Sequence, residues 1–147
     1  MFDETPSLAE KNFIEKRSPL TRWILTPIVL VVSASLIHAM VIWGSWILAF
    51  FWPKEDVEAN LWFFKIILAN GLSSYFSVYW ASITAPKFHC VVSYILASFY
   101  VIMNFVAFYF MLTDDFKWWD TNSIFIHLSS LVGAIIAVLI IRRDYDF

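Results

Sequence analysis

Four long apolar stretches alternate with short polar connections along the chain of 147 residues. The four stretches cover about 23–51, 61–83, 90–112 and 123–141. About 20 apolar residues are enough for a helix to cross the hydrocarbon core of a bilayer. The pattern therefore predicts an all-α integral membrane protein, in which four transmembrane helices form an antiparallel bundle. Residues 1–147 are expected to form one membrane domain that begins with a tail over residues 1–22.

Each apolar stretch carries one strongly polar side chain at a similar depth. These side chains are His38, Asn70, Asn104 and His127. They lie 13 to 15 residues from the end of each stretch that is assigned to the cytoplasm below, which is about 20–22 Å along a helix. Because lipid offers no hydrogen-bond partner, polar groups at this depth turn toward one another. The sequence thus predicts an intramembrane polar layer built from these four side chains.

Small and polar residues recur at helical spacing within three of the stretches. They are Ser74, Ser77 and Ala81 in the second, Ser93, Ala97 and Tyr100 in the third, and Ser129, Gly133 and Ala137 in the fourth. Membrane helices associate through close packing of small residues and through hydrogen bonds between helices. We therefore expect these faces to form the interior of the bundle.

The distribution of charge predicts the orientation of the helices. Hydrophobic residues make up 61% of the chain and charged residues 15%, which excludes an ordinary soluble domain. One side of the predicted bundle holds seven basic residues: Lys11, Lys16, Arg17, Arg22, Lys87, Arg142 and Arg143. The other side holds three, Lys54, Lys65 and Lys117, among acidic residues such as Asp114 and Asp115. The positive-inside rule then places both termini in the cytoplasm.

Two histidines from separate helices at matched depth suit the ligation of a b-type haem. His38 and His127 are the candidate ligands, and the alternative is that both imidazoles hydrogen-bond to asparagine or serine. No Asp or Glu lies within any apolar stretch, which disfavours a proton or ion pathway. His89 and Cys90 are adjacent but lack a third group to orient them as a nucleophilic pair. We expect no metal site and no enzymatic activity of the chain by itself.

Four arginines are expected near one level at the cytoplasmic side: Arg17, Arg22, Arg142 and Arg143. Arginine binds phosphate through two parallel hydrogen bonds, so these residues are candidates for contacting a nucleotide. The favoured interpretation is that they set the topology and face the headgroups of anionic lipids. No pattern in the chain indicates a nucleic-acid partner.

Short motifs between Asn12 and Phe88 carry a resemblance to a known family. They are Asn12-Phe13-Ile14, Arg17-Ser18-Pro19-Leu20 with Arg22, Ala69-Asn70, and Trp80 ahead of Lys87-Phe88. In these motifs the chain resembles the small accessory subunits of bacterial poly-N-acetylglucosamine synthases. The resemblance covers about half of the chain. That family has two spans where this chain has four, and the polar pair after its tryptophan is replaced here by Ser82-Ile83-Thr84.

The resemblance implies a non-catalytic subunit that braces a processive glycosyltransferase in the bacterial inner membrane. It also implies a role in exopolysaccharide biosynthesis and biofilm formation. Cyclic di-GMP would bind at the cytoplasmic interface with the partner, where Arg17 and Arg22 are the matched positions able to contact phosphate.

The chain has little mass outside its apolar stretches, so the residues themselves also predict a small accessory or regulatory subunit of a larger membrane protein. Two alternatives stay open at this point. One is a membrane anchor that binds haem b through His38 and His127, and the other is an immunity protein against a pore-forming toxin.

Overall fold

All regular structure in the described part of the chain is helical. The computed structural model describes residues 17–113 and 121–145, so most of the predicted tail and of the second outer connection lies outside it. The elements are α1 (Pro19–Ala49), α2 (Val57–Trp62), η1 (Phe63–Leu68), α3 (Ala69–Thr84), α4 (His89–Thr113) and α5 (Thr121–Asp144). Since α2, η1 and α3 are continuous, they form four helices that are long and apolar enough to cross a membrane. The four predicted stretches are confirmed as helices, with ends that agree within four residues.

Local sequence explains where α1 begins, where α3 ends and how the chain reverses before α4. Ser18 caps α1, since its hydroxyl accepts from the amide of Thr21 at 3.3 Å, and Pro19 occupies the first turn, where no amide donor is needed. Pro86 prevents α3 from continuing past Ala85. The chain then reverses, and Phe88 adopts a positive φ of 59° before α4 begins. The tight turn makes α3 and α4 antiparallel neighbours.

The second long helix contains a π-helical segment, η1, which the apolar pattern did not predict. Hydrogen bonds in a π-helix join residues five apart rather than four, so the backbone there is wider than in an α-helix. The Asn70 side chain donates to the carbonyl oxygens of Lys65 and Ile66 at 3.1 and 2.9 Å. These two bonds satisfy carbonyl groups within the widened turn.

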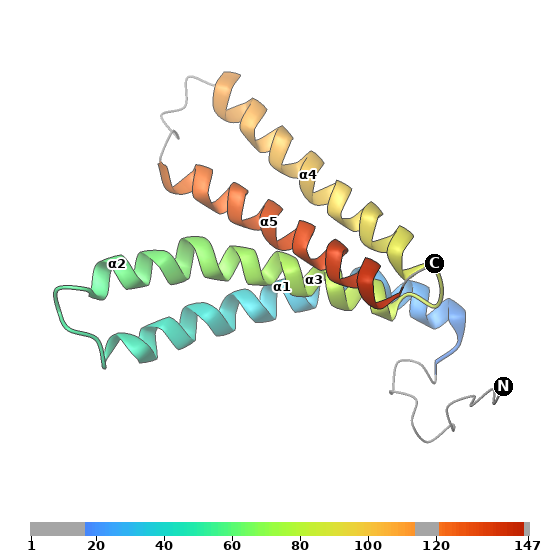
Figure 1. Ribbon diagram of the computed structural model, residues 1–147, viewed down its shortest axis with the longest axis horizontal. Helices are drawn as coiled ribbons and strands as arrows, with labels where there is room; N and C mark the ends of the chain where they lie inside the picture. The colour runs from blue at the N-terminus through green and yellow to red at the C-terminus, as the bar shows by residue number, and fades with distance from the viewer. Residues whose placement is uncertain (1–16, 114–120, 146–147) are drawn as a thin grey trace.

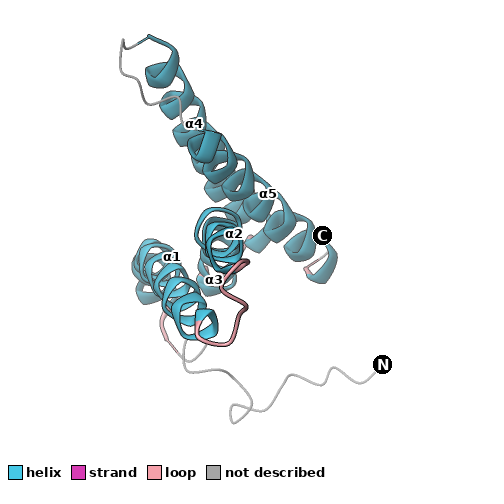
Figure 2. Cartoon of the chain, turned by 90° about the vertical axis from the view of Figure 1, so that its left-hand side faces the viewer, coloured by secondary structure: helices cyan, strands magenta, loops and turns pink. Residues whose placement is uncertain are grey.

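The helices form two antiparallel hairpins that meet along α3 and α5 (Figure 1). The first hairpin joins α1 to α2, η1 and α3, and the second joins α4 to α5. Since α3 and α5 run in the same direction, α3 has α1 on one side and the second hairpin on the other (Figure 2). Within residues 17–113 and 121–145, α1 packs against neither α4 nor α5. The arrangement is more open than the closed bundle that the sequence predicted.

Small side chains bring α3 and α5 into backbone contact. A methyl group added to Gly133 would overlap the carbonyl oxygen of Gly71 and the hydroxyl of Ser74. Farther along the same contact, Val78 of α3 is fully buried against Ala134 and Ala137. The predicted faces of small residues on the second and fourth stretches therefore form the center of the fold.

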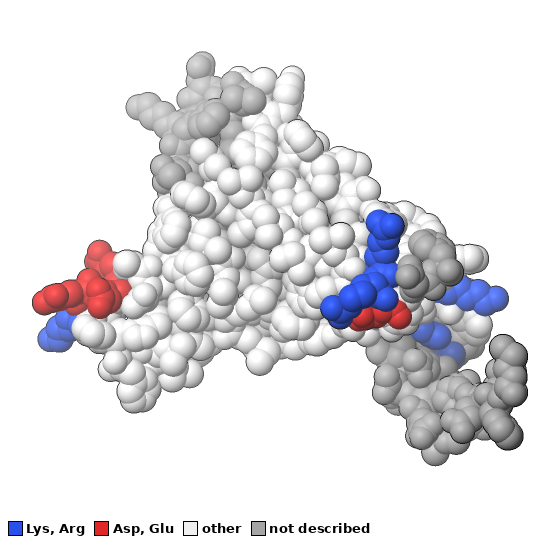
Figure 3. Space-filling model, in the orientation of Figure 1, with Lys and Arg blue, Asp and Glu red and all other residues white. Residues whose placement is uncertain are grey.

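Charged side chains lie at the two ends of the molecule, and no Lys, Arg, Asp or Glu is visible on the surface between them (Figure 3). Many large hydrophobic side chains on the helices are exposed. One end carries Arg22, Lys87, Arg142 and Arg143, where α1 begins and α3 and α5 end. The opposite end of the first hairpin carries Lys54, Glu55, Asp56 and Glu58. The long apolar surface between the ends has the pattern of a protein whose solvent is lipid.

Candidate functional site

Asn104 of α4 and His127 of α5 form a hydrogen bond inside the second hairpin. His127 Nδ1 lies 2.5 Å from Asn104 Oδ1, and Asn104 is buried. The amide nitrogen of Asn104 donates to the carbonyl oxygen of Tyr100 at 2.7 Å. This bond directs the amide oxygen toward the imidazole, so His127 Nδ1 must carry the proton that it donates. In the neutral tautomer, His127 Nε2 is then left as an acceptor.

A second polar contact joins α3 to α4 one turn away. The hydroxyls of Ser77 and Tyr100 lie 2.7 Å apart. Ser77 donates its own proton to the carbonyl oxygen of Ser74 at 2.9 Å, so Tyr100 donates to Ser77. Because Tyr100 and Asn104 occupy successive turns of α4, this helix is linked by side-chain hydrogen bonds to α3 on one turn and to α5 on the next.

The structure brings together two of the four side chains predicted to form the polar layer. Asn104 and His127 meet, whereas Asn70 uses its amide nitrogen within its own helix, as described above. His38 is half-buried on α1 and makes no hydrogen bond to a described residue. These four side chains therefore form one pair between helices and two bonds within the helix of Asn70, not a continuous layer.

The two histidines considered as haem ligands lie on helices that do not contact each other. His38 belongs to α1 and His127 to α5, and α3 lies between these helices. Nδ1 of His127 is already bonded to Asn104. The arrangement shows no facing pair of imidazoles, and no group of three or more His, Cys, Asp or Glu side chains occurs among the described residues.

Arg22 joins the start of α1 to the end of α3. Its Nε donates to the carbonyl oxygen of Thr84 at 3.0 Å, and its Nη2 donates to those of Ile83 and Ala85 at 3.2 and 2.8 Å. These carbonyl groups lie at a helix C-terminus, where intrahelical donors run out and the helix dipole is negative. Arg22 therefore caps α3 with the guanidinium edge that was predicted to contact phosphate.

The other three arginines of the predicted phosphate site are exposed. Arg17 lies just before α1, and Arg142 and Arg143 lie in the last turn of α5. Arg143 Nε bonds to Asp144 at 3.0 Å, and its side chain remains 76% exposed. Because α1 and α5 do not pack together, the structure does not form one continuous arginine cluster from the two helices.

His89 and Cys90 face different neighbours. His89 Nδ1 lies 2.8 Å from the carbonyl oxygen of Ser82, while the buried thiol of Cys90 donates to that of Tyr145 at 3.2 Å. The two side chains hold α4 against the ends of α3 and α5. This geometry gives them a structural use in joining helices, which their adjacency in the sequence did not indicate.

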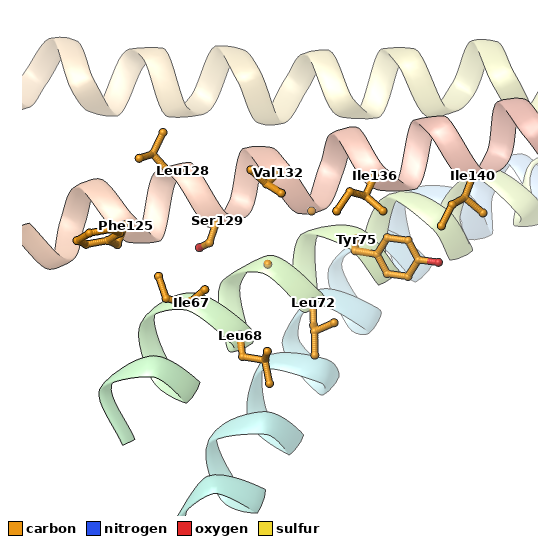
Figure 4. Close-up of a pocket in the computed structure, with 12 residues that line it drawn as sticks. Ile67, Leu68, Leu72, Tyr75, Phe125, Leu128, Ser129, Val132, Ile136 and Ile140 are labelled. Carbon is orange, nitrogen blue, oxygen red and sulfur yellow. The ribbon is translucent and has the colours of Figure 1, made fainter. Parts of the chain in front are cut away.

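An open, apolar groove lies between α3 and α5, with a volume of about 490 Å³ (Figure 4). Figure 4 shows Ile67, Leu68 and Leu72 on one wall and Phe125, Val132 and Ile136 on the other. Gly71 and Gly133 form part of its lining, where the two backbones touch. Tyr75 and Ile140 line the end of the groove toward the C-terminus of α5. The sequence analysis placed Gly133 on a face of small residues, but it predicted neither its contact with Gly71 nor the groove beside it.

Comparisons with family models, with curated proteins and with solved structures gave no match to this chain. Its function is therefore argued from its own residues and geometry.

The pair Asn104 and His127 predicts a measurable coupling between α4 and α5. We expect Asn104→Leu to lower the free energy of unfolding by about 0.5–2 kcal/mol, because it leaves the imidazole without its partner in an apolar interior. A double-mutant cycle with His127→Phe, followed by SDS titration in detergent micelles, gives the coupling energy. Asn70→Leu is the comparison, since its bonds lie within one helix and it should show no coupling to His127. Additive effects of Asn104→Leu and His127→Phe would contradict the interaction.

Proposed function

We propose that this chain is a multi-pass membrane subunit with both termini in the cytoplasm, which binds and stabilises or regulates a larger membrane protein. Four helices of sufficient length and an apolar surface support membrane insertion. Basic side chains at the end where α3 and α5 terminate support the cytoplasmic assignment of that end. The chain acts without an enzymatic activity of its own.

The exposed face of α4 is the observation that carries this proposal. A stripe of large side chains runs along it with spacings of four and three residues: Ile95, Phe99, Ile102, Val106 and Tyr109. Their exposed fractions range from 43% to 63%. An alternation of three and four residues keeps one face of a helix directed toward a partner helix over several turns.

A shallow depression on the same face contains a polar group. Ser98 lies in it beside Tyr94 and Phe99, is exposed, and makes no hydrogen bond to a described residue. A hydroxyl in contact with lipid lacks a partner, and serine hydroxyls in membranes commonly bond across helices. A transmembrane helix of the partner would supply that bond while covering the stripe.

The most specific form of the proposal takes the partner to be an exopolysaccharide synthase of the poly-N-acetylglucosamine type, in the bacterial inner membrane. The resemblance in the motifs around Arg17, Arg22 and Asn70 supports this form. Arg17 is the exposed residue of the matched pair, whereas Arg22 caps α3. Cyclic di-GMP at the interface with the synthase is part of the same proposal.

Photo-cross-linking in the native membrane tests the docking face. A benzoylphenylalanine placed at Ile102 of α4, which is 59% exposed, should cross-link to one larger membrane protein that mass spectrometry identifies. Ile28 of α1 is 50% exposed and provides the matched control, which should give lipid adducts instead. Gentle solubilisation of the unmodified protein should yield the same partner.

The outcomes separate the parts of this proposal. A cross-link from Ile28 but not Ile102 would place the partner on α1 and reject the α4 face. Isolation of a partner-free monomer with no protein cross-link from either position would reject the subunit role. A partner that is not a glycosyltransferase would reject the synthase assignment alone.

A further inference from the structure

The groove between α3 and α5 has the dimensions of a single hydrocarbon chain. From Phe125 to Ile140 the axis of α5 rises by about 22 Å. Spread over that length, a volume of about 490 Å³ gives an average cross-section of about 20 Å². A helix with its side chains is 10–12 Å wide, which corresponds to roughly 80–110 Å². An extended acyl chain, whose carbon atoms pack about 4 Å from their neighbours, has a cross-section on the order of 20 Å².

The walls of the groove match such a chain chemically. Val132 and Ile136 of α5 face Leu68 and Leu72 across it, and all four side chains are aliphatic (Figure 4). The groove is open along one side, so a lipid can enter laterally from the bilayer. Burial of an acyl chain against these walls would complete the packing that the small residues at the helix crossing leave open.

Charged groups follow the groove at its cytoplasmic end. The lining positions Ile136 and Ile140 of α5 continue at helical spacing to Arg143, which lies one turn farther along the same face. The Tyr75 hydroxyl points toward this end (Figure 4). Arg142, the residue before Arg143, is also exposed. A groove that is apolar along its length and cationic at one end has the polarity of an anionic lipid.

We propose that the α3–α5 groove binds one acyl chain of an anionic glycerophospholipid of the cytoplasmic leaflet, with the lipid phosphate against Arg143 and Arg142. Arg143 keeps its Nη donors for the phosphate while its Nε bonds to Asp144. The bound acyl chain then packs between α3 of the first hairpin and α5 of the second. This site needs membrane insertion in the proposed orientation but does not need the partner protein.

Native mass spectrometry of the detergent-solubilised full chain tests the site with phosphatidylglycerol as the probe. The wild-type protein should retain one phosphatidylglycerol at a concentration where Val132→Trp, which fills the groove, retains none. Val31→Trp is the matched control on α1, since Val31 and Val132 are 64% and 53% exposed, and it should bind as the wild type does. Val132→Ala widens the groove and should keep the lipid, which separates filling of the groove from general damage to the fold.

The head-group contact has its own test. Arg143→Gln should weaken phosphatidylglycerol binding about fivefold, the ratio that corresponds to ~1 kcal/mol per basic residue near an anionic lipid surface. Lys54→Gln, at the opposite end of the first hairpin, should leave binding unchanged. Glycerol phosphate, which lacks acyl chains, should not compete.

Three results would overturn the proposal. They are equal lipid retention by wild type and Val132→Trp, full displacement of the lipid by glycerol phosphate, and a second copy of the chain or a partner helix cross-linked to the groove. Isolation of a partner-free monomer with no protein cross-link from Ile102 or Ile28, with lipid retention intact, would reject the proposed function and leave this site standing.

Discussion

Replacing Gly133 by alanine is expected to separate α3 from α5 and to lower the free energy of unfolding by about 1–3 kcal/mol, the usual range for overpacking a tight interior. The added methyl group would meet the backbone carbonyl of Gly71, which cannot rotate away as a flexible side chain does. The two helices must therefore move apart, and the packing of Val78 against Ala137 weakens with them. SDS titration of the purified protein in micelles measures this loss.

Gly44→Ala is the matched control for that substitution. Gly44 lies in α1, and no heavy atom outside its own helix environment lies within 4 Å of an added methyl group. Alanine has the higher helix propensity, by about 0.8–1 kcal/mol in soluble hosts, so this variant should be as stable as the wild type or more so. Equal stabilities for Gly133→Ala and Gly44→Ala would mean that the helix crossing does not depend on the missing side chain.

Arg22→Met is expected to lower the free energy of unfolding by about 1.5–3 kcal/mol. Methionine keeps much of the apolar length of the side chain but removes three donors, so the carbonyl groups of Ile83, Thr84 and Ala85 lose their shared partner. Arg22→Lys should recover part of the loss, because one ammonium group cannot reproduce the fork of the guanidinium. The first hairpin should open at this end before the rest of the protein unfolds.

Arg142→Met provides the control for loss of charge. Arg142 is exposed in the last turn of α5, and surface substitutions of this kind usually change stability by less than about 0.5 kcal/mol. Hydrogen exchange of the amides in α3 gives a second measurement, since Arg22→Met should raise exchange near Thr84 and Arg142→Met should not. If the two variants have the same free energy of unfolding, Arg22 contributes to stability only through its charge and not through its hydrogen bonds to α3.

The positions of the helices could be predicted because lipid imposes a simple rule. A stretch that is apolar over about 20 residues is expected to form a helix in a bilayer, and Pro86 ends the second such helix. The faces that carry Ser74 and Gly133 could be predicted as the interior because small residues at helical spacing indicate close packing, although Gly71, which also lies at this contact, was not assigned to them. The helix positions and the faces of small residues depend on residues close in sequence, so the pattern of apolar and small residues predicts them.

The partners of the polar side chains could not be predicted from depth alone. Four groups at one height were expected to meet, but height does not fix the direction in which a side chain points around its helix. Asn70 turns to its own backbone, where it donates to the carbonyl oxygens of Lys65 and Ile66 in η1. His38 is separated from His127 because the hairpins meet through α3 and α5. Which helices become neighbours cannot be read from the sequence pattern of one helix.

Two contacts between helices use residues that the sequence analysis did not assign to the polar layer. Tyr100 donates to Ser77, although both belonged to faces predicted from their small neighbours. Trp62 Nε1 donates to Asn122 Oδ1 at 2.5 Å, where the first hairpin meets the start of α5. The indole nitrogen of Trp62 thus joins the first hairpin to α5. Polar atoms on residues that are otherwise apolar are the signal that was missed.

The π-helical turn in η1 has a consequence for the lineage of this protein. Such a turn accommodates one residue more than the α-helix around it, and one residue corresponds to about 100° of rotation. Deleting a single residue between Phe63 and Leu68 would restore the regular ladder and swing Trp62 away from Asn122. Descendants of the same ancestor that lost this extra residue would need a one-position gap in an alignment here. They would also need another contact in place of the hydrogen bond between Trp62 and Asn122, which joins the two hairpins at this end.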